Sequence, residues 1–355
     1  MMRAYPFAIV YLVPFSVIIG YLFGKFFGGF FGGFLTFLTP IVVFIVVPLL
    51  DEVFGYTYKN PDEKKEKELE QKKSFRVLTW FAMPITIGLV IWGSYIVSLG
   101  NLSIIEFIGL TISIGISSGV LGINTAHEMQ HRVNNKLEPF LARLTLLPSL
   151  YIHWGLEHVT GHHRWVATPE DPATAKLNQS YYSFWAQTVF GSFKSAWKFE
   201  KSKLARQNKR LILIRNRVLH YVFYEILFIL FITLIFGFFA LLFFVLQSLI
   251  AISLLEIINY IEHYGLLRKK DSEGNYERVK PHHSWNSSKR LTNWFLFNLQ
   301  RHSDHHYKPG RRYQLLRHFD EARQLPTGYA GMVLIALIPP LFKRIINPRI
   351  PTKDN

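Results

Sequence analysis

The chain contains no cysteine among its 355 residues. This absence excludes disulfide bonds, thiolate-ligated haem, cysteine-ligated iron–sulfur clusters and zinc ribbons. The sequence also lacks a P-loop and a G-x-G-x-x-G turn that follows a strand, so no site for a nicotinamide, a flavin or a nucleotide is visible. Any redox reaction at this chain would therefore need electrons from outside it.

Acidic residues are few beside basic ones, 24 against 40, which gives a formal net charge of +16. Such an excess is typical of proteins that bind nucleic acid or a membrane surface. No nucleic-acid-binding motif accompanies it, and half of the residues are hydrophobic. The balance favours a membrane protein and no nucleic-acid partner.

Apolar segments long enough for a bilayer recur along the chain. A hydrocarbon core of about 30 Å needs about 20 apolar residues per helix. Six segments reach or approach this length: 7–24, 26–50, 75–99, 102–123, 218–236 and 238–260. The first runs into the second without a small-residue cleavage site, so we expect an anchor, not a signal peptide.

The run 329–342 contains Pro339-Pro340 and is too short to span, so we expect it to be interfacial or buried. The sequence predicts an all-α integral membrane protein.

The distribution of lysine and arginine predicts the orientation. If the N-terminus is cytoplasmic, the loops near 25, 100 and 237 lie outside and carry one basic residue, Lys25. The positive-inside rule favours this topology. We therefore predict spans one to four in 1–123 with a cytoplasmic loop at 51–74, spans five and six in 218–260, and cytoplasmic segments at 124–217 and 261–355. All 14 histidines then lie on the cytoplasmic side.

Nine histidines gather in four short clusters. The pairs His127/His131, His158/His162 and His302/His306 are each four residues apart, so on a helix both rings leave one face. Imidazole binds iron, zinc, copper and nickel, and nine rings are too many for one ion. The clusters predict a two-metal site in a helical cytoplasmic cap. On spacing alone, His263 remains open.

Other histidines receive simpler interpretations. His153, His220 and His318 stand alone, and the adjacent pair His282-His283 follows a proline, so we leave these outside the metal site. His127-Glu128-x-x-His131 matches the zinc-protease motif, but that reading leaves the remaining clusters unexplained.

Carboxylates flank the rings. Metal-bound histidines usually donate their second N–H to a carboxylate or a carbonyl. Four carboxylates could do this here, or one could ligate directly; ordinary salt bridges are the alternative for Glu128, Glu157, Glu262 and Asp304. Glu256 and Asn259 lie near the inner end of the sixth span, where a carboxylate is a functional candidate.

The sequences around these histidines resemble those of the membrane-bound alkane 1-monooxygenases, within the membrane fatty-acid desaturase and hydroxylase superfamily. The likeness is carried by residues 127–132, 157–163 and 299–306, and residues 259–265 resemble the signature that separates this family from desaturases. Further similar stretches are 166–173, 281–287 and 325–329. The likeness extends from about Pro48 to Pro348.

This resemblance implies a non-haem diiron enzyme that uses O2 to convert an n-alkane to a primary alcohol. It implies nine iron ligands, which are His127, His131, His158, His162, His163, His263, His302, His305 and His306. It also implies electrons from rubredoxin, with rubredoxin reductase and NADH upstream, and a place in the bacterial inner membrane. How the nine ligands divide between two irons does not follow.

Two further expectations concern the substrate and the electron donor. An alkane has no polar group, so only the shape of a pocket can select it. We expect the small side chains Val43, Val46 and Val47 to line a deep channel that favours long chains, although packing of the helix bundle would use the same residues. We expect the basic residues Lys308, Arg311 and Arg312, with Arg317 and Arg323 nearby, to attract an acidic donor.

Alternative functions remain open from the sequence. A xylene-type side-chain monooxygenase or a fatty-acyl desaturase or hydroxylase would use the same metal scaffold. An intramembrane zinc protease and a metal transporter are further alternatives. A transporter would place ionisable groups within the spans, where few occur.

Overall fold

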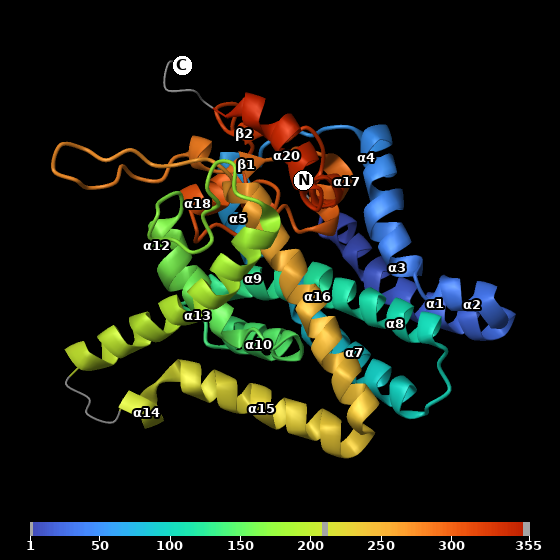
Figure 1. The fold of residues 1–355 in the computed structure, drawn as a ribbon. Helices are drawn as coiled ribbons and strands as arrows, with labels where there is room; N and C mark the ends of the chain where they lie inside the picture. Colours follow the sequence, from blue (N-terminus) through green and yellow to red (C-terminus); the bar gives the residue numbers. More distant parts are fainter. Residues whose placement is uncertain (1–2, 208–211, 351–355) are drawn as a thin grey trace.

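Helices make up most of the chain (Figure 1). The structure, a computed structural model, describes residues 3–207 and 212–350. The parts of the predicted segments at 1–2, 208–211 and 351–355 lie outside the described residues.

Within the described residues, five helices are long and apolar enough to cross a membrane, and a bent pair of helices makes a sixth candidate span. Tyr5–Phe27 contains α1 (Leu12–Phe27), Lys73–Ser98 contains α6 (Lys73–Trp80) and α7 (Ala82–Ser98), and Ile104–Gln130 contains α8 (Ile104–Ser117) and α9 (Asn124–Gln130). The other two are α15 (Arg217–Phe236) and α16 (Phe238–His263). The sixth joins α2 (Gly29–Leu35) to α3 (Leu38–Ile41) and α4 (Val47–Phe54) through a 52° bend. This arrangement confirms the predicted all-α, multi-pass membrane protein, but the second span is broken where a single helix was expected.

The two short connections are made by glycines. Gly28 (φ 62°) separates α1 from α2, and Gly237 (φ 84°) separates α15 from α16. Both backbones are in the left-handed region, which glycine adopts without steric cost. The first turn lies at Gly28, three residues beyond the loop expected near Lys25. A Cβ added to Gly24 would lie only 2.7 Å from the Gly32 carbonyl oxygen, so small residues bring these two helices together.

In the part of the chain that the structure describes, three helices contain a π-helical turn. These turns are Val42–Val46 between α3 and α4, Ser118–Ile123 between α8 and α9, and His158–His162 after α11 (Ile152–Glu157). A π turn inserts one residue into an α-helix and is frequent at functional sites. All three turns contribute residues to the cavity or the histidine cluster described below.

The long helix α16 passes through the middle of the molecule (Figure 1) and packs against α7, α8, α13 (Tyr181–Arg206) and α15. Its buried Glu256 accepts hydrogen bonds from Tyr151 Oη (2.9 Å), Thr188 Oγ1 (2.9 Å) and Asn259 Nδ2 (3.0 Å). Glu256, a functional candidate from the sequence, thus ties α16 to α13 and to the residue that precedes α11. These contacts stabilise the packing of the three segments.

The remaining elements form a cap on one end of the spans. They are α5 (Glu66–Gln71), α10 (Leu137–Leu146), α12 (His163–Trp165), α14 (Ile212–Arg215), α17 (Arg290–Phe295), α18 (His302–Tyr307), α19 (Tyr329–Ala336) and α20 (Pro339–Ile346). Two-residue strands β1 (Trp285–Asn286) and β2 (Arg323–Gln324) pair in parallel, with Trp285 opposite Arg323. The run 329–342 forms α19 and the start of α20, whose buried Met332, Val333 and Phe342 join the core around α16.

Candidate metal centre

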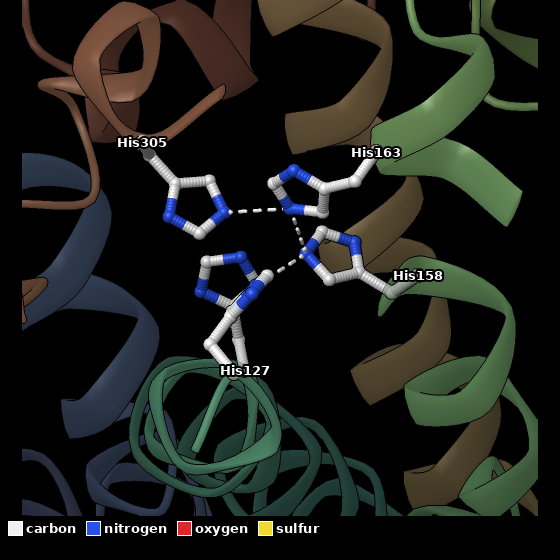
Figure 2. A group of neighbouring side chains, drawn as sticks. His127, His158, His163 and His305 are labelled. Carbon is white, nitrogen blue, oxygen red and sulfur yellow. Dashed lines mark hydrogen bonds between the residues drawn. The ribbon is translucent and has the colours of Figure 1, made fainter. Parts of the chain in front are cut away.

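The structure brings all nine predicted histidines together in two adjacent groups. The five-histidine group consists of His127, His131, His158, His163 and His305, and the four-histidine group of His162, His263, His302 and His306. Within each group, one ligand nitrogen from every ring lies within 4.8 Å of the others. Figure 2 shows four rings of the five-histidine group pointing toward one another: His127 from α9, His305 from α18, and His158 and His163 from the helical segment that joins the π turn to α12.

The ends of two membrane helices carry part of this site. The helix Ile104–Gln130 continues past the predicted span end at 123 and carries His127 in α9, with His131 directly after it. α16 continues past 260 and ends at His263. The other ligands come from the π turn His158–His162, from α12 and from α18. The ends of the spans thus hold three rings in place, and segments outside the spans supply the other six.

Adjacent and near-adjacent histidines divide between the groups. His305 belongs to the five-histidine group and His306 to the four-histidine group, as expected when neighbouring side chains diverge on a helix. His158 and His162 also separate, and His158 joins His163 instead. The π turn that contains both residues changes their angular relation from that of an α-helix.

The distances between ring nitrogens fit metal ligands better than hydrogen bonds. His158 Nε2 lies 3.1 Å from His131 Nε2 and 3.1 Å from His163 Nε2, which is itself 3.0 Å from His305 Nε2. A neutral imidazole nitrogen has one lone pair or one N–H in the ring plane, so it cannot bond well to two partners at once. Converging lone pairs suit a cation held between the rings.

The same pattern recurs in the four-histidine group. His302 Nε2 lies 2.8 Å from His306 Nε2 and 3.1 Å from His263 Nε2, and His306 Nε2 is 3.3 Å from His162 Nε2. The rings of His163 and His306, one from each group, have centroids 4.4 Å apart. The donor set therefore fits two neighbouring ions of a metal that prefers imidazole.

Burial keeps most of these rings neutral. It lowers the pKa values of His158, His302, His305 and His306 well below the usual value, and the neighbouring rings lower them further. A neutral imidazole is the form that ligates a metal. The site therefore presents ligands that need not lose a proton at neutral pH.

Two carboxylates stand behind the four-histidine group. His162 Nδ1 lies 2.9 Å from Asp171 Oδ2, and His302 Nδ1 lies 3.2 Å from Glu262 Oε1. Burial lowers the pKa of His162, but the Asp171 carboxylate more than offsets this, so the net shift is upward. Asp171 therefore orients the His162 ring and raises its basicity, whereas Glu262 lies beside His302 without a hydrogen bond to it. Asp171 was not singled out from the sequence, although it lies nine residues after His162 in a stretch that carries the family likeness.

The other three flanking carboxylates contact groups other than histidines. Glu128 pairs with Arg132, Asp304 accepts from Arg311 Nη1 at 2.6 Å, and Glu157 accepts from Ser195 Oγ at 2.9 Å. Burial and the nearby Asp171 raise the pKa of Glu157 to about 8. Glu128 is thus engaged by an arginine, which argues against its use as the general base of a zinc protease.

The predicted donor-docking arginines are largely occupied. Arg311 is paired with Asp304, and the buried Arg312 lies 3.1 Å from Glu138 Oε2. The backbone carbonyls of Gly310 and Arg311 accept from Arg132. These contacts brace the loop after α18. Of the three residues expected to dock a donor, Lys308 alone is exposed.

A third group, Glu277, His282 and His283, also clusters. The Lys280 backbone N–H donates to His283 Nδ1 at 3.0 Å, which leaves the proton of a neutral ring on Nε2, 3.4 Å from Glu277 Oε1. That nitrogen has no free lone pair. The pair therefore stabilises its loop and lies outside the two histidine groups. His153, His220 and His318 also lie outside both groups.

An apolar cavity of about 90 Å³ opens onto the histidines. Its lining includes Val43, Phe44, Leu254, Phe295 and Val333, together with the three histidines His127, His158 and His302. Of the three valines expected to line a channel, Val43 and Val47 line this cavity. Val46 does not, and its side chain is 38% exposed on the outside of the helix.

Similarity to known proteins covers most of the chain. The family model described as fatty acid desaturase matches residues 104–335. Alkane 1-monooxygenase of Acinetobacter baylyi is 43% identical over 88% of this chain and 76% of that protein. Alkane 1-monooxygenase 2 of Pseudomonas aeruginosa is 39% identical over 87% and 82%.

A more distant relative is the xylene/toluene monooxygenase hydroxylase component of Pseudomonas putida. It is 28% identical over 76% of this chain and 73% of that protein. The higher identity to several alkane 1-monooxygenases confirms the resemblance that the histidine boxes carry. With its six apolar segments and its paired histidine groups, the chain belongs to the alkane 1-monooxygenase family, among the proteins described by the fatty acid desaturase model.

Proposed function

We propose that the protein is a non-haem diiron monooxygenase that hydroxylates the terminal carbon of n-alkanes with O2. One observation carries the proposal: a cavity lined mainly by apolar side chains is also lined by histidines of both groups, His127 and His158 from one and His302 from the other. An unfunctionalised chain could enter only such a cavity. The names of the relatives at 37–43% identity support the same reaction.

The nine histidines would hold two iron ions, five rings at one and four at the other. Bound iron supplies the activation of dioxygen that an unactivated C–H bond requires. The protein's own contribution is positioning and exclusion of water. Phe44, Leu254 and Val333 would hold the chain beside the histidines that line the same cavity, and the burial of these rings leaves little room for solvent.

Electrons would come from rubredoxin, itself reduced by a reductase with NADH, because the chain contains no cysteine and no visible nucleotide site. The basic cap offers attraction for an acidic donor. Lys308 is the docking candidate that the contacts favour, since Arg311 and Arg312 are engaged in ion pairs. A reduction rate by rubredoxin that does not change with ionic strength would contradict docking through these charges.

The same proposal includes the topology. Residues 51–74, 124–217 and 261–355 would face the cytoplasm, and the spans would lie in a bacterial inner membrane. Both histidine groups would then lie at the cytoplasmic surface of this membrane, where an apolar substrate from the bilayer and a soluble donor can reach them.

Reconstituted turnover tests the function. Iron-loaded protein in lipid is given rubredoxin, its reductase, NADH and n-alkanes of graded length, and products are identified by gas chromatography and mass spectrometry. The expected product is the primary alcohol. If xylenes or fatty acyl chains react and alkanes do not, the metal site stands and the substrate proposal is wrong.

Replacing Val43 with Trp should shorten the longest alkane accepted. The side chain of Val43 lines the cavity, so an indole there would fill space that a long chain needs. Val46→Trp is the matched control, because Val46 lies on the outside of the same helix. The chain-length profile of products is the measurement, and identical profiles for both variants would contradict a channel at this position.

A further inference from the structure

A second cavity, of about 490 Å³, is lined by basic, polar and apolar side chains and by none of the nine histidines. It forms where the segment before α1, the loop 57–65 and the turn between α17 and α18 meet. Four cations line it, Arg3, Lys59, Lys65 and Arg301. The one carboxylate in its lining, Asp62, lies 3.9 Å from Lys65. This cavity therefore has a strong excess of positive charge.

Arg301 is the buried member of this set. Its side chain donates to the carbonyl oxygens of Leu316 (2.7 Å), Lys59 (3.1 Å) and Thr57 (3.3 Å). The residue is 3% exposed, and its Nε has no hydrogen-bond partner. A buried guanidinium with a spare N–H is costly unless an anion compensates it.

Protein carboxylates leave most of this charge unpaired. Within residues 3–207 and 212–350, the side chains of Arg3, Lys59 and Arg301 form no ion pair. Asp304, the carboxylate nearest to Arg301 in the chain, accepts two hydrogen bonds from Arg311 instead. A guanidinium offers a planar fork of donors that suits phosphate or carboxylate oxygens. The cavity is therefore suited to an anion from outside the chain.

The surroundings of the cavity indicate where its anion comes from. Phe7 and Trp294 also line it, and it adjoins the start of the first span at Tyr5. Tryptophan and tyrosine are typical of membrane interfaces, where lysine and arginine attract anionic lipids. Beyond it along the first span, Leu12 and Phe15 are exposed, so an acyl chain could lie against them.

We propose that this cavity binds a phosphate group, supplied by an anionic phospholipid headgroup or by free phosphate. Arg3, Lys59, Lys65 and Arg301 would contact the phosphate oxygens. Because Arg301 precedes His302 in the chain, an occupied cavity would also help to fix the start of α18.

The test uses the full-length, metal-loaded protein in a neutral detergent. Dioleoylphosphatidylglycerol, dioleoylphosphatidylcholine or inorganic phosphate is titrated in, and the shift in Tm is followed. Lys59→Gln/Lys65→Gln removes two cavity cations. Lys64→Gln/Lys67→Gln is the matched control, since it removes the same charge from the same segment outside the cavity lining.

Phosphatidylglycerol should raise the Tm of the unmodified protein and of the control at the same concentration. The cavity variant should need roughly 30-fold more lipid for the same shift, from two lost cations. An equal effect of inorganic phosphate would assign the site to free phosphate. The proposal would be overturned if the two double variants showed the same Tm shift at each lipid concentration. It would also be overturned if neither phosphatidylglycerol nor inorganic phosphate raised the Tm of the unmodified protein. If the cavity variant does not retain metal, Arg3→Gln serves in the same comparison.

Discussion

The five-histidine group and the four-histidine group differ in what lies behind their rings. The four-histidine group has Asp171 against His162 and Glu262 against His302. Among the described residues, no carboxylate contacts a ring of the five-histidine group, and its His163 is only partly buried. Similar ligand atoms therefore meet two different electrostatic environments. We expect the four-histidine group to hold its metal more tightly.

Removal of one ligand should have the largest effect. His305→Ala takes one ring from the five-histidine group and His302→Ala one from the four-histidine group. Either should reduce alcohol formation by about 100-fold or more, since even the residues behind metal ligands typically contribute about 10–100-fold. Metal content per chain, measured by mass spectrometry, should fall by about one ion in each variant.

His220→Ala is the control, because this lone histidine is exposed and lies outside both groups. If the ligand variants kept full activity and two ions, the assignment of these rings to metals would be wrong. If both lost both ions, the two groups would be one cooperative unit.

Asp171→Asn should weaken metal binding by the four-histidine group while leaving its rings in place. The amide keeps the shape of the carboxylate but removes the charge that makes His162 more basic. Metal affinity should fall about 10–100-fold at one of the two sites. Retention of metal during dialysis against a chelator is the measurement.

Asp320→Asn provides a matched control, since Asp320 also contacts a histidine ring, that of His318, away from the site. Loss of metal from both variants alike would reject a specific role of Asp171.

Acidification of the metal-free protein should show a smaller effect. Burial lowers the pKa values of His158 and His305 in the folded protein. As the pH falls, these histidines are therefore protonated at a higher pH in the unfolded chain than in the folded protein, and Tm should fall below about pH 6.5. His162 opposes this trend, because Asp171 raises its pKa and so adds stability at low pH.

Asp171→Asn should therefore make the fall in Tm between pH 7 and pH 5 steeper. One proton corresponds to about 1.4 kcal/mol per pH unit, or a shift of a few degrees. Thermal scans of the metal-free protein at several pH values provide the test. Parallel curves for the two proteins would contradict the sign of the His162 shift.

Hydropathy and spacing predicted much of this molecule. The apolar runs located the spans, since the bilayer imposes their length, and the clusters located the histidines that meet in space. The division into five and four could not be predicted, because His158 and His162 lie on a π turn that no residue pattern marked.

The departures from the sequence expectations have related causes. Val43, Val46 and Val47 would share one face of an α-helix, but the π turn Val42–Val46 turns Val46 outward. Arg311 and Arg312 were expected to be free surface charges. Their partners Asp304 and Glu138 come next to them only in the folded structure, so the sequence did not show these ion pairs. Asp171 was overlooked for the same reason.

The π turn Ser118–Ile123 makes the site sensitive to the number of residues that precede it. An α-helix advances about 1.5 Å and turns about 100° with each residue. Because a π turn holds one residue more than an α turn, the same residues wound as a regular α-helix would turn His127 by about 100° relative to the start of the span. The helix therefore has a phase as well as a composition, and the π turn sets the phase that points His127 at the other rings.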